Sequence, residues 1–363
     1  MNVAIIGLPQ SGKTTVFNAL TRGQSSSIGT GGAGGQMRVG VVKVPDSRLT
    51  LLAEMYQPEK VVQAEITYWD LAGLESSARS QGIAGRHRNI LQGADAFLLV
   101  VRAFNDPSVS HPSTTVDPGR DLETMLVELA FADLEVLERA TERLGDNIRK
   151  AKVEERRALT QHLAAVEKVK LALEVGVPLR RQQLTRSESA FMINYQPLSA
   201  KPVIVAFNTD ESGAEVALGK LLANPEDAAG LGEVSLCAKL EADLAQMPDE
   251  EASEYRRELG LGESALSKVV AVSYELLGLV SFLTIGDDEV RAWSVPSGMP
   301  AQEAAGAVHS DFKRGFIRAE VIPFDDLVRC GSIAQGRRDG VLRSEGKSYP
   351  VKDGDVIDFL VNP

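Results

Sequence analysis

The apolar residues of this chain recur in two patterns, short continuous runs and longer stretches with helical spacing. The first run is residues 1–6 (MNVAII), and similar runs occupy residues 37–44, 64–70, 94–104 and 201–208. Apolar runs of this length between polar residues are typical of buried strands, and helical patterns separate them. The alternation of strands and helices predicts an α/β fold with a mostly parallel sheet.

A long charged segment at residues 121–175 interrupts the strand pattern. Its apolar residues recur every three or four positions in two successive stretches, which is the spacing of amphipathic helices. We therefore expect two antiparallel helices that turn near residues 149–157 (RKAKVEERR) and pack on each other.

Three further segments complete the predicted organisation. Residues 25–36 are rich in glycine and serine and predict a mobile loop without regular structure. Residues 260–280 have helical spacing, and the strand-like segments that follow predict a small β-rich domain. The domains we expect are an α/β domain at residues 1–120 and 195–278, a helical hairpin at residues 121–194 and a β-rich domain at residues 279–363.

Composition narrows the class of protein. The net charge of −11 argues against DNA binding through bulk charge, so that any contact with RNA must be local. The two cysteines, Cys237 and Cys330, are too few for a disulfide framework and fit a reducing compartment. No apolar run approaches the ~18 residues of a membrane span, and no secretory leader is recognisable. We therefore expect a cytoplasmic protein that does not bind membranes.

The stretch GLPQSGKT, Gly7 to Thr14, has the spacing G-x-x-x-x-G-K-[ST] of a phosphate-binding P-loop, between a predicted strand and a predicted helix. The glycines allow a tight turn in which backbone N–H groups face phosphate oxygens. Lys13 is then expected to reach the β- and γ-phosphates, and the Thr14 hydroxyl to bind Mg²⁺. The nucleotide-binding residues predicted from this motif are Gln10, Ser11, Gly12, Lys13, Thr14 and Thr15.

A second motif follows the strand at 64–70, where Asp70 to Gly73 read D-x-x-G. In P-loop GTPases this Asp holds Mg²⁺ through water and the Gly amide contacts the γ-phosphate. The motif is short, but its position after a strand supports the assignment. The next residue, Leu74, cannot orient an attacking water as the Gln of Ras-like proteins does.

The expected base-recognition motif follows the strand at 201–208. It reads Asn208-Thr209-Asp210-Glu211 where the superfamily has N-K-x-D, and Cys237-Ala238-Lys239 stands in place of S-A-K. Glu211 places its carboxylate one methylene too far out for guanine, so that guanine should lose its advantage. An ordinary exposed turn is the alternative. The residues predicted to contact the base are Asn208, Thr209, Glu211, Cys237, Ala238 and Lys239.

Together these motifs resemble the Obg-like ATPase family, the YchF group of P-loop NTPases. The similarity covers almost the whole chain and is carried by GLPQSGKTTVFNALT, VGVVKVPDSRL, DLAGL, HPSTTVDPGRDLET, KPVIVAFNTDE and GFIRAEVIPFDDLV. The resemblance implies a nucleotide domain interrupted by a helical hairpin and followed by a TGS domain at residues 279–363. It also implies slow hydrolysis of ATP in preference to GTP, with Mg²⁺ as cofactor, and association with the ribosome.

The resemblance further implies a replacement for the missing Gln. His111, in the loop after the strand at 94–104, matches the histidine that is the family's catalytic candidate, although a lone loop histidine is otherwise most often solvent-facing. His87, His162 and His309 match no such position, and we expect them to be structural.

Basic residues gather locally in this acidic chain. They lie in residues 149–157, 178–186, 313–318 and 336–347. Such clusters can bind phosphate backbones, and we expect the hairpin and the C-terminal domain to form a platform for the ribosome. The alternative is that these are solvated helix faces and turns.

Two departures from the family pattern leave other functions open. Gly34 stands where the family has a Thr that ligates Mg²⁺, with Thr30 the only nearby hydroxyl of this type, and the glycine-rich stretch after D-x-x-G is altered. One alternative is therefore a regulatory module that binds nucleotide with negligible hydrolysis. Another is a small-molecule P-loop kinase, although the hairpin suits a stiff arm better than a lid. The sequence predicts no oligomeric state.

Overall fold

The computed structural model describes residues 1–29, 36–71, 83, 85–211, 216–222, 225–262, 264–286 and 288–362. These residues form two compact units. The first comprises residues 1–41 and 67–272, and the second comprises residues 42–66 and 273–363. The chain therefore enters the second unit early, between two strands of the first, and returns to it at its C-terminal end.

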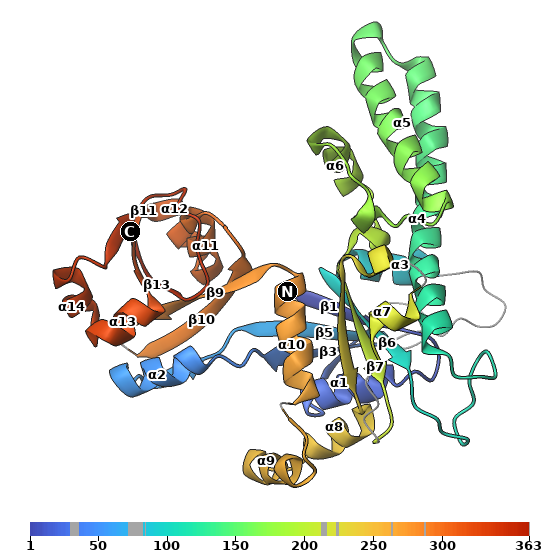
Figure 1. Cartoon of the computed structure of the whole chain (residues 1–363). Helices are drawn as coiled ribbons and strands as arrows, with labels where there is room; N and C mark the ends of the chain where they lie inside the picture. Colours follow the sequence, from blue (N-terminus) through green and yellow to red (C-terminus); the bar gives the residue numbers. More distant parts are fainter. Residues whose placement is uncertain are drawn as a thin grey trace. The chain divides into compact units, whose positions relative to one another are not determined.

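The first unit contains the predicted α/β architecture (Figure 1). Its strands are β1 (Asn2–Ile6), β2 (Ser26–Gly29), β3 (Gln36–Lys43), β5 (Glu65–Leu71), β6 (Ala96–Arg102), β7 (Val203–Asn208) and β8 (Leu231–Leu236). Its α-helices are α1 (Lys13–Thr21), α3 (Gly85–Gln92), α4 (Pro118–Lys150), α5 (Val153–Glu174), α6 (Arg186–Ile193), α7 (Leu218–Leu221), α8 (Ala238–Leu244), α9 (Asp249–Glu258) and α10 (Ala265–Leu276). Short 3₁₀ turns are η1 (Leu179–Arg181), η2 (Leu198–Ala200) and η3 (Pro225–Ala228).

The strands join in the order β2-β3-β5-β1-β6-β7-β8 within the described residues. β1 pairs in parallel with β5 and β6, and β6, β7 and β8 pair in parallel in turn. Every residue of β6 and β7 is buried, as expected for central parallel strands covered by helices on both faces. The prediction of a mostly parallel sheet is confirmed, and the loops at the carboxyl ends of these strands can carry a ligand site.

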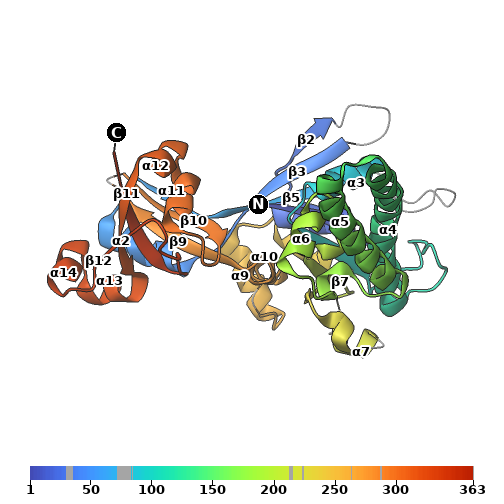
Figure 2. The same cartoon turned by 90° about the horizontal axis from the view of Figure 1, so that it is seen from above.

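The segment at 25–36 differs from the prediction. Ser26–Gly29 forms β2, an edge strand that pairs antiparallel with β3, and Figure 2 shows the two strands side by side. The expectation of no regular structure was wrong for these four residues. Pairing with β3 provides hydrogen-bond partners for their backbone, and this tertiary contact outweighs the weak strand preference of the local sequence. Residues 30–35 of that segment lie outside the described residues.

The predicted helical hairpin is confirmed. α4 and α5 lie side by side and turn at residues 151–152, inside the basic segment (Figure 1). Apolar residues of both helices, among them Leu144 and Val166, form a core of their own. The first turns of α4 pack instead on the sheet, through Leu122 and Leu129. The regularly spaced apolar residues of 121–175 therefore pack partly on the sheet and partly within the hairpin.

A buried carboxylate fixes the base of the hairpin. Asp133 of α4 is 1% exposed and accepts hydrogen bonds from the backbone N–H groups of Leu198 and Ser199, both at 2.8 Å. Arg88 of α3 lies 3.4 Å away. Burial raises the pKa of Asp133 and lowers that of Arg88, although each group stabilises the charge of the other. The hairpin is thus held to the domain by a satisfied polar contact as well as by apolar packing.

The second unit is the predicted β-rich domain with an additional segment from residues 42–66. Its strands are β4 (Lys60–Val62), β9 (Leu279–Ile285), β10 (Glu289–Pro296), β11 (Phe316–Pro323), β12 (Arg343–Glu345) and β13 (Asp355–Val361), in the order β12-β11-β13-β9-β10-β4. Its helices are α2 (Ser47–Tyr56), α11 (Ala301–Val308), α12 (Ser310–Gly315), α13 (Phe324–Cys330) and α14 (Ile333–Arg338).

The early segment joins this unit through strand pairing and an ion pair. β4 pairs in parallel with β10, and Arg48 of α2 donates to Asp353 at 2.7 Å. Burial opposes the charge of Arg48, but hydrogen bonds to Asp46 and Asp353 outweigh it and raise its pKa above its usual value. Across the described residues, none of the helices combines the length and apolarity needed to cross a bilayer.

Candidate functional site

The P-loop connects β1 to α1 and has the backbone conformation that its glycines allow. Gly7 and Gly12 have φ angles of 149° and 97°, and Gln10 also has a positive φ, of 62°. A Cβ on Gly7 would stand 2.4 Å from the carbonyl oxygen of Val100, and one on Gly12 would stand 2.2 Å from the Asn208 amide nitrogen. Both glycines are therefore required by conformation and by space. The tight loop that the motif predicts is present.

Lys13 begins α1 and turns back over this loop. Its ammonium donates to the carbonyl oxygens of Gly7 and Leu8, at 3.1 and 2.8 Å. The residue is 9% exposed, so that its charge lies within the loop itself. A cation held in this position can reach the phosphates of a bound nucleotide. Thr15, one residue after Thr14 in the first turn of α1, is half-buried.

The two predicted metal-binding residues lie together. The Thr14 hydroxyl donates to Asp70 Oδ2 at 3.1 Å, although 56 positions separate the two residues in the sequence. Asp70, near the end of β5, is 3% exposed. A hydroxyl and a buried carboxylate at this distance match the oxygen ligands that Mg²⁺ prefers when it also binds phosphate. The residues present therefore fit a magnesium ion.

Asn208 connects the P-loop to the loop after β8. Its amide nitrogen donates to the Ser11 carbonyl oxygen, and its side-chain oxygen accepts from the backbone N–H of Ala238, both at 3.0 Å. Asn208 is 5% exposed, so that both ends of the amide are satisfied in a buried setting. The structure thus brings the first and last of the predicted motifs together through one side chain.

The other predicted base-contacting residues surround this connection. Thr209 is buried, and its backbone N–H donates to the Leu236 carbonyl oxygen at 2.8 Å. Cys237 precedes α8 as its N-cap residue. At the surface, the Lys239 ammonium lies 3.8 Å from Glu211 Oε1, and both side chains are exposed. The Glu211 carboxylate therefore has a cationic partner of its own.

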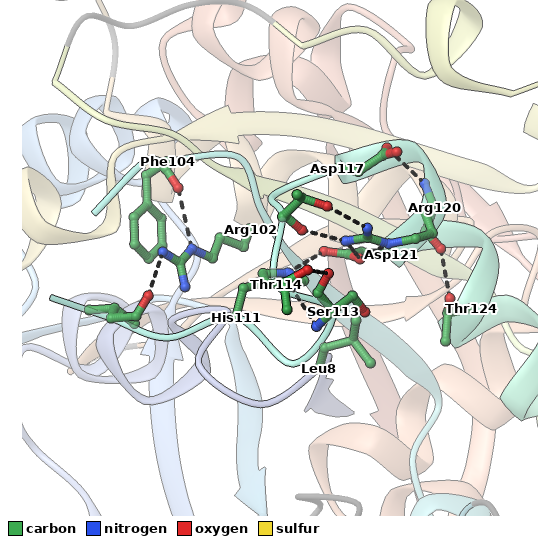
Figure 3. A network of polar contacts seen from close by, with 12 residues as sticks. Leu8, Arg102, Phe104, His111, Ser113, Thr114, Asp117, Arg120, Asp121 and Thr124 are labelled. Atoms are coloured by element: carbon green, nitrogen blue, oxygen red, sulfur yellow. Dashed lines mark hydrogen bonds and ion pairs between the residues drawn. The ribbon is translucent and has the colours of Figure 1, made fainter. Parts of the chain in front are cut away.

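His111 lies in the loop between β6 and α4, with its side chain 4% exposed (Figure 3). Its Nδ1 accepts a hydrogen bond from the backbone N–H of Ser113 at 3.0 Å, and its Nε2 is 2.8 Å from Asp121 Oδ2. Because Nδ1 accepts, Nε2 carries the hydrogen and donates to Asp121. Both ring nitrogens are engaged, and the ring faces a small pocket that Leu8 and Ser11 of the P-loop also line.

Arg102 organises the loop that carries His111. It is 3% exposed, lies over the Phe104 ring and donates to four loop carbonyl oxygens, those of Phe104, Asp106, Val109 and Ser110. The Ser110 hydroxyl in turn donates to the Gln10 side chain of the P-loop at 3.1 Å. The loop is thus tied to the phosphate-binding loop next to His111.

Asp121 lies in the first turn of α4 and is 3% exposed. Besides His111 it binds the guanidinium of Arg120, at 2.8 to 3.0 Å (Figure 3). We did not predict Asp121 or Arg102 from the sequence. An acidic residue in the first turn after an Asp-Pro cap is a signal for a helix N-terminus, but nothing local indicates that a loop histidine binds there.

Among the residues that bear on the predicted site, Gly73, Leu74, Thr30 and Gly34 lie outside the described residues. Of the other histidines, His162 stacks on Phe191 and hydrogen-bonds Tyr195, and His309 caps α12. His87 is buried at 7% exposure.

Two family models match this chain, one toward each end. Residues 2–138 match the model of a family described as 50S ribosome-binding GTPase. Residues 279–362 match the YchF-GTPase_C family model, described as a protein of unknown function. The first match includes the P-loop and extends into α4, and the second runs from β9 to β13.

Individual relatives match over the whole length. The ribosome-binding ATPase YchF of Bacillus subtilis is 36% identical over 367 aligned residues, which cover 100% of this chain and 99% of the relative. The Escherichia coli O157:H7 protein of the same name is 38% identical and covers 99% and 98%. A solved structure, that of the Schizosaccharomyces pombe YchF GTPase, has a TM-score of 0.85 at 30% identity and covers 99% of this chain and 97% of that one.

Proposed function

The chain belongs to the YchF family, and from this premise we propose that it is a slow, magnesium-dependent ATPase that acts as a switch on the ribosome. The observation that carries the proposal is the convergence of the P-loop, Asp70 and Asn208 at one edge of the parallel sheet. Ribosome binding and ATPase activity are what the names of the matched bacterial relatives state.

Each part of the site has a distinct task in this proposal. The P-loop N–H groups and Lys13 bind and orient the phosphates, and Thr14 and Asp70 would hold Mg²⁺. When bound, Mg²⁺ would neutralise the negative charge that develops on the phosphate oxygens as ADP leaves. Asn208 holds the loop after β8 next to the P-loop, because its amide bonds Ser11 on one side and Ala238 on the other.

Slow hydrolysis follows from the position of His111. The side chain has no free ring nitrogen while it binds Ser113 and Asp121, so it cannot orient a water in this arrangement. We propose that the loop at 103–117 must rearrange before His111 assists the attack of water. The Ser110–Gln10 hydrogen bond gives a route by which phosphate binding at the P-loop can reach that loop.

His111→Ala should lower kcat by roughly 10- to 100-fold, as for loss of a group that assists water only in the transition state. The affinity for ATP should remain unchanged, because the side-chain hydrogen bonds of His111 go to Ser113 and Asp121, which are not among the residues predicted to bind nucleotide. Phosphate release and ATP binding are measured separately.

The exposed His309, in the second unit, provides the matched control. His309→Ala should keep the wild-type kcat. Equal turnover in all three proteins would show that His111 is only a loop residue. No measurable hydrolysis in the wild type, with ATP still bound, would favour the regulatory module over the ATPase.

The hairpin tip supplies a surface for the ribosome. Its cationic side chains are exposed and stand at the turn between α4 and α5. They are Arg149, Lys150, Lys152, Arg156 and Arg157. Cations at the end of a stiff arm can contact ribosomal RNA phosphates even though the whole chain is acidic. A ribosome-bound protein of this kind is expected in the cytoplasm.

Reversal of three tip charges, in Lys150→Glu, Lys152→Glu and Arg157→Glu combined, should abolish co-sedimentation with ribosomes at moderate salt. Phosphate contacts of this kind are lost steeply as charge is removed. The measurement compares the full-length wild type and variant with ribosomes, in ADP and in a non-hydrolysable ATP analogue.

Reversal of three exposed cations elsewhere, Lys43, Arg257 and Lys268, is the matched control and should leave co-sedimentation intact. Binding that is equally weakened by both sets would indicate bulk charge rather than the tip. Absence of wild-type co-sedimentation with either nucleotide at low salt would contradict the ribosomal role.

A further inference from the structure

Arg38 of β3 extends toward the site where we place Mg²⁺. Its Nη2 donates to Asn18 Oδ1 of α1 at 2.6 Å and to the Ser25 hydroxyl at 3.2 Å. The guanidinium also lies over the Phe17 ring, 4.8 Å from its centroid. These three contacts fix the orientation of the guanidinium, which is therefore more restrained than that of a freely solvated surface arginine.

The other terminal nitrogen of the Arg38 guanidinium, Nη1, faces Asp70. Arg38 Nη1 is 3.8 Å from Asp70 Oδ2, the same oxygen that accepts the hydrogen bond from Thr14. The Asp70 side chain is 5% exposed and that of Arg38 is 28% exposed. Their attraction is consequently screened less by solvent than that of a surface pair.

We propose that Arg38 is an internal competitor of Mg²⁺ for Asp70 and lowers the dependence of nucleotide binding on magnesium. This inference rests on the proposed function, in which Thr14 and Asp70 hold the metal. A guanidinium and a divalent cation beside one carboxylate repel each other, so that each weakens the binding of the other. In the absence of Mg²⁺ the Arg38 charge balances Asp70 and reduces its repulsion of the nucleotide phosphates.

Arg38 differs in this respect from Lys13, the cation of the P-loop. Lys13 contacts P-loop carbonyl oxygens and would bind phosphate with or without metal. Arg38 contacts the metal-binding carboxylate itself. Removal of the Arg38 charge should therefore alter mainly how strongly nucleotide binding depends on Mg²⁺. The overall affinity for nucleotide should change much less.

The test uses a fluorescent ADP analogue, whose dissociation constant is measured in EDTA and in saturating Mg²⁺ for the full-length protein. The dissociation constant in EDTA divided by that in Mg²⁺ reports the coupling between metal and nucleotide, and this ratio does not depend on hydrolysis. In Arg38→Gln this ratio should increase roughly tenfold over the wild type, since affinity falls in EDTA and rises in Mg²⁺.

Two further variants separate this role from a structural one. Arg38→Lys keeps the charge and should keep the ratio close to that of the wild type, whereas Lys43→Gln removes a charge from the exposed end of the same strand and should not alter it. Thermal unfolding of each variant identifies any loss of stability from the contacts to Asn18 and Phe17.

An unchanged ratio in a folded Arg38→Gln variant, with normal ADP binding in the wild type, would overturn the competition while leaving the proposed function intact. An equal change in Arg38→Lys and Arg38→Gln would show that the contacts to α1, not the charge, are responsible, and would also overturn it. A wild type that binds no nucleotide would instead overturn the proposed function, and this inference with it.

Discussion

Lys13→Ala is expected to abolish measurable binding of ATP while the protein remains folded. Lys13 supplies the cation of the P-loop, and a hydrogen bond to a charged group contributes about 1.5 to 3 kcal/mol. Loss of two such contacts to phosphate oxygens should weaken binding by roughly 100-fold or more. A titration with a fluorescent ATP analogue measures the effect directly.

The fold should tolerate this change. The Lys13 ammonium contacts two carbonyl oxygens of its own loop, and the apolar core of the domain consists of other residues. Circular dichroism and thermal unfolding verify that the variant is folded, and Lys43→Ala, on the exposed end of β3, is the matched control. Wild-type affinity in a folded Lys13→Ala protein would contradict the assignment of the site.

The sequence was sufficient for the parts of the site that depend on local pattern. The P-loop, Asp70 and Asn208 lie at the carboxyl ends of β1, β5 and β7, because parallel strands deliver these ends to one edge of the sheet. Thr14 and Asp70 meet there as the motifs predict. The hairpin could also be predicted, since helical spacing recurs in two successive stretches between residues 121 and 175.

Contacts that no motif encodes could not be predicted in this way. The bond of His111 to Asp121, the reach of Arg38 to Asp70 and the pairing of β4 with β10 all depend on how packed elements are oriented. β4 has three residues, too few for a recognisable periodicity, and its partner lies more than 200 positions away. Such short strands acquire their structure from tertiary pairing rather than from intrinsic preference.

The names of the matched relatives include both an ATPase and a GTPase, so the preferred nucleotide must be decided from the chain itself. Guanine recognition of the superfamily type needs a free carboxylate that accepts two hydrogens from one base edge. Here the Glu211 carboxylate is one methylene longer and lies 3.8 Å from the Lys239 ammonium, while Asn208 uses both ends of its amide between the loops. Glu211 therefore differs from the superfamily carboxylate both in its length and in having a cationic neighbour.

ATP should therefore bind more tightly than GTP, by roughly 1 to 3 kcal/mol, which corresponds to about 10- to 100-fold in affinity. Competition of each unlabelled nucleotide against one fluorescent probe measures the ratio under identical conditions. A GTP preference of any size would contradict the proposal.

A paired substitution tests the cause of this preference. Thr209→Lys with Glu211→Asp restores the superfamily pattern, and the ratio of ATP to GTP affinity should fall toward one or reverse. Glu211→Gln provides the matched control, because it preserves length but cannot accept both guanine hydrogens, and it should leave GTP weak. If the paired variant keeps the full ATP preference, Thr209 and Glu211 are not its cause, and the contribution of these two positions to base selection is refuted.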